Sequence, residues 1–183
     1  MKHDRNGAIL ILFKDNTRQE VYSVYRPDYK VWNLTGGGKE EGESFKEAAM
    51  REAKEETSFK VKFIRKLGYG VKFDKSGKVL NQTDVFEGRI ISGTFKPEFP
   101  GNIGAWFNVN HLPSNMSFKT REIIQRSVKV KDKEFYDNSI DEPFWGNIKY
   151  IICHPFRAKK YILEKMQDEK YLSDHLVNGL NKS

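Results

Sequence analysis

Three consecutive glycines, Gly36 to Gly38, stand a few residues ahead of a strong helix signal. No regular element tolerates such a run well, so the backbone there must turn sharply or approach another group closely. Ser44 and Glu47 have the spacing of a capping box, and apolar residues then recur at helical spacing from Phe45 to Ala53. The sequence therefore predicts a glycine loop followed directly by a helix from Ser44 to about Thr57.

Strands are predicted on both sides of this unit. Runs rich in β-branched and aromatic residues are separated by polar, turn-forming clusters. The expected strands cover residues 8–13, 20–25, 60–73, 79–90 and 105–109, a short apolar piece covers residues 31–34, and a second helix covers residues 120–128. The order β-β-loop-α-β-β-β-α predicts a mixed α/β class in which helices pack on strands.

Length and composition indicate one globular domain with an addition. A chain of 183 residues fits about one domain, and 38% apolar and 13% aromatic residues argue against disorder. The apolar run from Ala8 to Phe13 is too short for a membrane span or a signal peptide. Cys153 is the single cysteine, which fits a reducing compartment. We expect a cytoplasmic protein without a membrane partner.

The chain has two predicted parts, with a main domain at residues 1–130 and a C-terminal extension at 131–183 packed on it. From residue 131 onward the sequence changes character, with a polar, irregular stretch at 137–145 and a helical pattern at 157–167. The net charge of +7 lies entirely in the first part and favours phosphate-bearing partners. Residues 60–78 hold seven cations and one acid. This segment is either a solvated strand face that guards a sheet edge or a track for phosphates.

Three glutamates carry the clearest chemical signal. On the predicted helix, Glu52, Glu55 and Glu56 share one face within a single turn, where their charges repel one another. Arg51 can neutralise one of them, whereas Mg²⁺ or Mn²⁺ can satisfy several at once with oxygen ligands. An acidic, solvated helix face is the alternative. The glycine loop favours the metal site, because a solvated helix does not require it.

The segment from Gly37 to Phe59 resembles the Nudix box of the Nudix hydrolase superfamily. Its identity-restricted positions are matched by Gly37, Glu43, Arg51, Glu52, Glu55 and Glu56. Ser58 stands where the family has a glycine that ends the helix, and Ala53 replaces a larger aliphatic residue. Both departures affect packing and helix termination rather than the carboxylates. The resemblance implies a mixed-sheet α/β/α sandwich over residues 1–130.

The resemblance also implies an activity and a site. The implied reaction is the attack of water on phosphorus in a diphosphate attached to another group, usually a nucleoside. The carboxylates of Glu52, Glu55 and Glu56 match the family's metal ligands, together with the carbonyl of Gly37. Arg51 and Glu43 match the pair that orients these ligands through a salt bridge.

Residues outside the box complete the expected site. Glu98, in the loop before Trp106, is the candidate for the base that accepts a proton from water. Substrate contacts are expected from Gly36, Gly38, Arg26 and Trp32; Trp32 is the preferred base-stacking residue because it stands close before the glycine run.

The sequence leaves the substrate open. Residue patterns typical of ADP-ribose, diadenosine polyphosphate and NADH hydrolases are missing, which leaves a nucleoside triphosphate or a related nucleotide as the expected substrate. One alternative is a hydrolase that acts on the 5′ end of RNA. Another is a nucleotide sensor of the same fold that does not cleave its ligand. A homodimer is a further expectation, since members of the family often dimerise.

Overall fold

The computed structural model describes residues 6–73 and 77–137. The chain divides into two units, Met1–Asp141 and Glu142–Ser183, and all described residues belong to the first unit. The predicted helix at 157–167 therefore lies outside the described residues, as does most of the predicted irregular stretch before it. Within the described ranges, no helix is long and apolar enough to cross a membrane.

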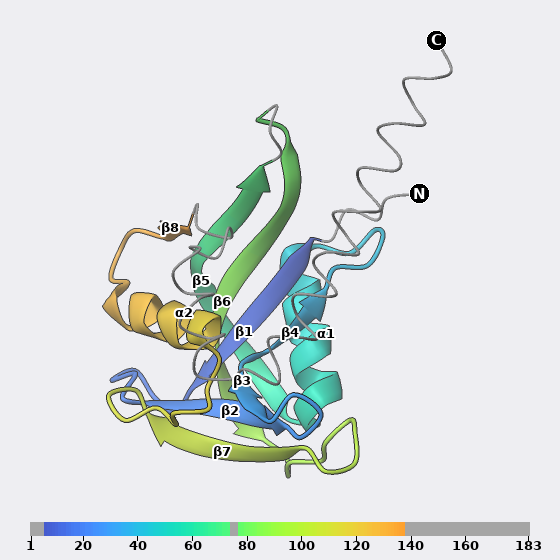
Figure 1. The fold of residues 1–183 in the computed structure, drawn as a ribbon, viewed down its shortest axis with the longest axis vertical. Helices are drawn as coiled ribbons and strands as arrows, with labels where there is room; N and C mark the ends of the chain where they lie inside the picture. Colours follow the sequence, from blue (N-terminus) through green and yellow to red (C-terminus); the bar gives the residue numbers. More distant parts are fainter. Residues whose placement is uncertain (1–5, 74–76, 138–183) are drawn as a thin grey trace. The chain divides into compact units, whose positions relative to one another are not determined.

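The predicted order of elements is confirmed, with three strands added in the described part (Figure 1). The strands of the described part are β1 (Gly7–Phe13), β2 (Glu20–Arg26), β3 (Val31–Asn33), β4 (Thr35–Gly38), β5 (Lys60–Phe73), β6 (Val79–Ser92), β7 (Ile103–Asn108) and β8 (Phe135–Asp137). Its helices are α1 (Phe45–Thr57) and α2 (Phe118–Lys129). The sequence did not predict β3, β4 and β8 as strands.

The sheet is mixed and splits near its middle. Its main order is β3-β2-β1-β6-β5-β8, with β4 paired to β1 and β7 paired to β2. β1 runs parallel to β6 but pairs with β2 only at two positions, Leu12 with Tyr22 and Phe13 with Val21. Beyond these positions β1 pairs with β4, while the end of β2 pairs with β3. The two halves of the sheet therefore diverge, and a space opens between them.

The glycine run forms a strand, so the prediction of a loop there was wrong. Gly36 and Gly37 pair with Ile9 and Ala8 of β1. A Cβ atom on Gly36 would lie 2.4 Å from the carbonyl oxygen of Ala8, closer than side chains permit. The glycines thus serve the close approach that the sequence predicted, but they do so within an extended strand. Glycine has low strand propensity, and the tertiary contact overrides it here.

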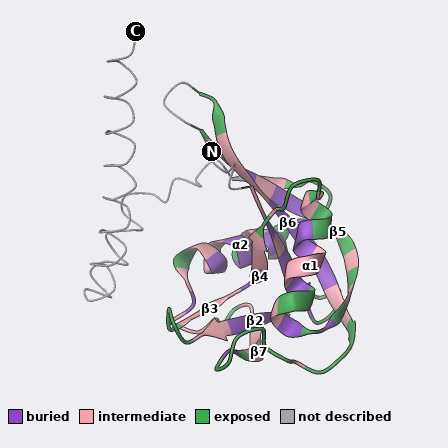
Figure 2. Cartoon of the chain, turned by 90° about the vertical axis from the view of Figure 1, so that its right-hand side faces the viewer, coloured by how far each residue is buried: buried purple, intermediate pink, exposed green. Residues whose placement is uncertain are grey.

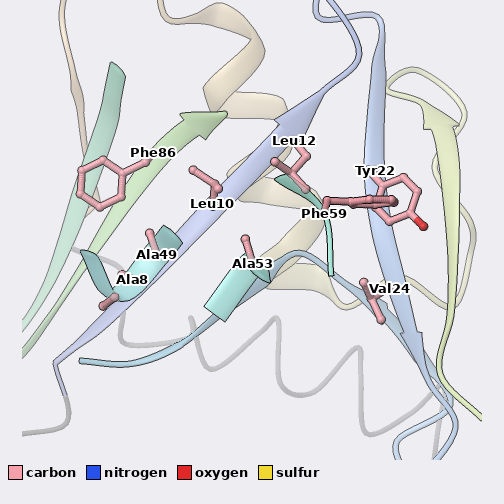
Figure 3. Packing of buried hydrophobic residues seen from close by; sticks show 10 residues of the cluster. Ala8, Leu10, Leu12, Tyr22, Val24, Ala49, Ala53, Phe59 and Phe86 are labelled. Atoms are coloured by element: carbon pink, nitrogen blue, oxygen red, sulfur yellow. The ribbon is translucent and has the colours of Figure 1, made fainter. Parts of the chain in front are cut away.

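The two helices cover opposite faces of the sheet. Ala48, Ala49 and Ala53 of α1 pack in one core cluster with Leu10 and Leu12 of β1 (Figure 3). The second cluster joins residues of α2 to the alternate positions of β1. Because successive side chains of a strand point to opposite faces, this alternation gives an α/β/α sandwich. Figure 2 shows buried residues on the inner sides of both helices and exposed ones at the end of the β5–β6 hairpin.

Helix α1 begins and ends where the sequence predicts. Ser44 Oγ accepts a hydrogen bond from the N–H of Glu47, and a Glu47 carboxylate oxygen accepts one from the N–H of Ser44. Ser58 follows the last turn with φ of 60°, in the left-handed conformation that favours glycine. A serine there costs about 1 kcal/mol relative to glycine, yet the helix end is not displaced.

The basic segment of β5 lies at an edge of the described sheet. Lys60, Lys62 and Ile64 are exposed, while the side chains between them are partly buried. β8 pairs with β5 only from Gly68 to Gly70, so residues 60–66 have no second neighbouring strand in the described part. The exposed edge position agrees with the interpretation of these lysines as a solvated strand face. The alternative of a track for phosphates stays a prediction.

Candidate active site

A hollow of about 210 Å³ occupies the space where the sheet splits. Both halves of the sheet line it, together with α1 and the first turn of α2: Ile9, Val24, Arg26, Asn33, Leu34, Gly36, Glu56 and Thr120. We refer to it as the split-sheet hollow. Two predicted substrate residues, Gly36 and Arg26, line this hollow, and so does Glu56 of the predicted metal site.

Arg51 of α1 organises the acidic residues. Its Nε donates a hydrogen bond to Glu43 Oε1 at 2.9 Å, and its Nη1 donates to Glu52 Oε1 at 2.9 Å and to Glu55 Oε2 at 3.0 Å. Its Nη2 donates to the carbonyl oxygen of Gly38 at 2.8 Å. One guanidinium therefore ties the loop before α1, the helix itself and strand β4 together.

These contacts shift the pKa values of both partners. Hydrogen bonds from Arg51 lower the pKa of the Glu43 carboxyl below its usual value, and a backbone N–H from Glu40 acts in the same direction. The bond to Glu43 in turn raises the pKa of Arg51, with smaller contributions from Glu52 and Glu55. Glu43 and Arg51 thus remain charged at neutral pH, as a fixed pair beside the other acids.

Gly37 and Glu52 are in close contact. A Cβ atom on Gly37 would lie 2.4 Å from the carboxyl carbon of Glu52 and 2.4 to 2.6 Å from its two oxygens. Only glycine leaves room for this carboxyl group beside β4. The structure thereby brings the Gly37 backbone next to one of the three predicted metal ligands.

Glu56 has a different environment from the other acids. Its Oε2 accepts a hydrogen bond of 3.2 Å from the N–H of Gly36. Burial raises the pKa of Glu56 to about 7; the charges of Glu52 and Glu98 add to this rise, while the Gly36 bond and Arg26 oppose it. Glu56 is thus close to half-protonated at neutral pH, and both Arg26 and Glu98 act on it electrostatically.

The acids supply the donors that a hard divalent cation prefers. Carboxylates and a nearby backbone carbonyl fit Mg²⁺ or Mn²⁺, whereas zinc prefers sulfur and nitrogen ligands. In the described residues, however, no three acidic, His or Cys side chains gather around one point as a metal site requires. Arg51 binds the carboxylates of Glu52 and Glu55, while the N–H of Gly36 binds the carboxylate of Glu56. These carboxylates must therefore reorient to share one cation.

The remaining predicted residues have different positions. Trp32 is absent from the lining of the split-sheet hollow, and its ring packs on Phe107 at 4.7 Å and on Tyr25 at 5.3 Å between ring centres. Glu98 is exposed in the segment between β6 and β7. Its charge contributes to the raised pKa of Glu56, after burial and the charge of Glu52.

Glu87, a buried acid of β6, belongs to another cluster. It is 1% exposed and forms ion pairs with Arg18 at 2.5 Å, Arg65 at 3.2 Å and Arg89 at 2.6 Å. Arg18 and Arg65 also donate hydrogen bonds to the carbonyl of Val130, just after α2. This cluster holds the end of α2 against the sheet.

Two residues of the hollow were missed by the sequence interpretation. Asn33 Oδ1 accepts a hydrogen bond of 3.1 Å from Thr120 Oγ1, and Thr120 is linked to the N-cap residue Ser117 of α2. Asn33 could have been noticed as the polar residue inside the short apolar run at 31–34. Thr120 carries no comparable signal, because only the docking of α2 brings it to this site.

Comparisons with known proteins agree with this architecture. A putative 8-oxo-dGTP diphosphatase from Bacillus subtilis is 32% identical over 108 residues, which cover 58% of this chain and 68% of that protein. Among solved structures, a MutT NUDIX hydrolase from Burkholderia pseudomallei has a TM-score of 0.54 at 21% identity, covering 67% of this chain and 96% of its own. An ADP-ribose pyrophosphatase from Streptococcus suis has a TM-score of 0.57 at 17% identity, with coverages of 73% and 97%.

The two structural relatives share the fold at low sequence identity, while the relative from Bacillus subtilis is similar in sequence as well. The NUDIX domain matches residues 3–127, a range that contains both helices up to Ser127 and every acid discussed above. Members of this family are hydrolases of nucleotide-type diphosphates that generally use divalent cations. The chain therefore belongs to the NUDIX domain family and is a Nudix-type pyrophosphohydrolase.

Proposed function

We propose that this chain hydrolyses a diphosphate bond in a nucleoside triphosphate or another nucleoside-diphosphate derivative, with Mg²⁺ or Mn²⁺ as its cofactor. The observation that carries the proposal is the arrangement around Arg51, which joins Glu43, Glu52 and Glu55 beside β4. This acidic cluster lies next to the split-sheet hollow, which Glu56 lines. A diphosphate at the cluster would leave its nucleoside within reach of the hollow.

The cation would be held by Glu52, Glu55 and Glu56, with the carbonyl of Gly37 close by. When bound, it would neutralise charge on the phosphates and make the attacking water more acidic. Glu43 and Arg51 act as positioning residues, because their ion pair holds the guanidinium beside Glu52 and Glu55. Arg51 would release Glu52 and Glu55 as these turn toward the cation, while its bonds to Glu43 and Gly38 persist.

Glu98 is proposed to accept the proton from the water that attacks phosphorus. It is exposed, so it can exchange this proton with solvent, and its charge acts on Glu56. A base in this position needs only modest basicity, since the cation would already lower the pKa of the water that attacks phosphorus.

The nucleoside is proposed to enter the split-sheet hollow. Arg26 offers a cation, and Asn33 offers an amide whose oxygen is already bound by Thr120, which leaves its N–H groups for a ligand. The relative named as an 8-oxo-dGTP diphosphatase supports a nucleotide substrate. The contribution of Trp32 would be indirect, through its packing beside β3.

The RNA 5′ end as a substrate, the homodimer, the cytoplasmic location and the division at residue 130 remain predictions. Strand β8 bears on the predicted division at residue 130, because its residues 135–137 pair with β5 of the main sheet. The sensor alternative is the least supported, because a protein that only binds nucleotides has no need to retain all the box carboxylates.

The proposed function can be tested with a panel of substrates. Nucleoside triphosphates, nucleoside diphosphate sugars and a 5′-triphosphorylated RNA would be incubated with Mg²⁺ or Mn²⁺ in ¹⁸O-labelled water, and the products identified by mass spectrometry. We expect metal-dependent cleavage of a small nucleotide, with the label in one phosphate product. Cleavage confined to the RNA would favour the alternative, and binding without any cleavage would favour the sensor.

A further inference from the structure

A second hollow lies beside the acidic cluster, away from the substrate residues considered so far. It is a groove of about 780 Å³ between the second half of α1 and the first residues of β5. Met50, Phe59 and Val61 contribute apolar surface to it. We refer to it as the lysine groove, because Lys54 and Lys60 form its charged side.

The lysine groove is electropositive. It is lined by Arg51, Lys54 and Lys60, and a single acid, Glu55, lies among them. Arg51 is engaged with the acidic cluster, but Lys54 and Lys60 are exposed, and their ammonium groups make no ion pair or hydrogen bond within the described part. Two cations without partners beside one acid favour a negatively charged ligand.

The groove and the split-sheet hollow meet the acidic cluster at different residues. Arg51 and Glu55 of the acidic cluster also line the groove, whereas Glu56, the residue after Glu55, lines the hollow. A diphosphate bound at the cluster therefore has a cavity near each of its two ends. One end can carry the nucleoside into the split-sheet hollow, and the other end points to the lysine groove.

We propose that the lysine groove binds a negatively charged group attached to the far end of the diphosphate. This inference rests on the proposed function and narrows it to substrates that carry phosphate beyond the bond being cleaved. A neutral sugar in that position would gain nothing from Lys54 and Lys60. The extra phosphate can come from a longer phosphate chain or from a second phosphorylated moiety, for which the apolar side of the groove offers contact.

The test compares three substrates with the same base: a nucleoside tetraphosphate, a dinucleoside tetraphosphate and a nucleoside diphosphate sugar. The variant is Lys54→Ala/Lys60→Ala, and the matched control is Lys129→Ala, which removes one exposed lysine from the last turn of α2. We expect KM for both tetraphosphates to rise about tenfold in the double variant, with kcat and the KM of the sugar nucleotide within twofold of wild type. Lys129→Ala should change none of these values.

Two further measurements complete the test. The difference between wild type and double variant should vanish near 1 M salt, where the screening length falls to about 3 Å. A larger loss for the dinucleoside substrate identifies a second phosphorylated moiety as the bound group, and an equal loss identifies the phosphate chain alone. An unchanged KM for both tetraphosphates, or an equal rise for all three substrates, overturns the inference. Failure of the proposed function is recognised separately, because wild type would then cleave none of the three.

Discussion

The carboxyl group of Glu52 lies against the backbone of Gly37, in the space that any larger residue at position 37 would fill. This contact couples strand β4 to helix α1 at the proposed metal site. It also gives a physical reason for a glycine at this point, independent of any turn.

Gly37→Ala should lower kcat by about a hundredfold, because the added Cβ would push the Glu52 carboxylate away by an ångström or more. Gly38→Ala is the comparison, since a Cβ there would meet nothing within 4 Å. Steady-state rates at saturating Mg²⁺ measure the effect, and Gly38→Ala should lose less than threefold. Equal losses in both variants would mean that β4 needs flexible backbone rather than space.

Glu43→Gln should raise the Mg²⁺ concentration for half-maximal activity by about tenfold, because Arg51 loses its strongest partner and no longer fixes the carboxylates. The fold should persist, since Glu43 lies outside both core clusters. A metal titration measures the Mg²⁺ requirement, and a circular dichroism spectrum checks that the fold is retained. Arg51→Lys should behave similarly, because lysine cannot make the same set of directed bonds.

Glu56→Gln should lower turnover by orders of magnitude and change how the stability of the protein depends on pH. The pKa of Glu56 is raised from its ordinary 4.5 to about 7 in the folded state. A raised carboxyl pKa means that the folded state binds the proton more tightly than the unfolded state does. Proton binding by Glu56 therefore adds to the free energy of unfolding, and this contribution is fully present below pH 4.5. It is lost as pH rises toward 7.

The measurement is the melting temperature of metal-free protein, with a chelator present, at pH 5 and pH 7.5. Wild type should melt about 5 °C higher at pH 5, and Glu56→Gln should show little of this difference. The lowered pKa of Glu43 acts in the opposite direction, but only at more acidic pH. A wild-type protein that is more stable at pH 7.5 would contradict the assignment.

Ser58→Gly should stabilise the protein by about 0.5–1 kcal/mol, because glycine adopts the left-handed backbone at the end of α1 without strain. The gain is reduced by losing the hydrogen bond of 3.2 Å from Ser58 Oγ to the carbonyl of Lys96. Ser58→Ala loses the same bond and keeps the strain, so it should destabilise. Urea unfolding of wild type, Ser58→Gly and Ser58→Ala gives the order of their free energies of unfolding.

Glu98→Gln should reduce kcat without altering the Mg²⁺ requirement, since this residue is proposed to take a proton and not to bind the cation. Activity of wild type should be poor in acid and rise toward alkaline pH, because the ligands must be ionised. In the variant, the pH–rate profile should be flatter between pH 6 and 9. A profile of unchanged shape and height would remove Glu98 from the reaction.

Much of this protein is determined locally by its sequence. The capping box at Ser44, the alanine face of α1 and the apolar run from Ala8 to Phe13 are patterns over a few residues, and each predicts its element correctly. The spacing of Glu52, Glu55 and Glu56 follows from helix geometry alone. The bond from Arg51 to Glu43 also follows from the family pattern, and the structure agrees with it.

Tertiary structure decided the rest, because it depends on contacts between distant segments. Gly36 lies in a strand only because β1 and β2 diverge after two pairs and leave an edge of β1 free. The hollow acquires Thr120 only when α2 docks, and the ring of Trp32 packs on Phe107, a residue far away in the sequence. No local pattern encodes these outcomes, since each is set by which surfaces are buried together when the chain folds.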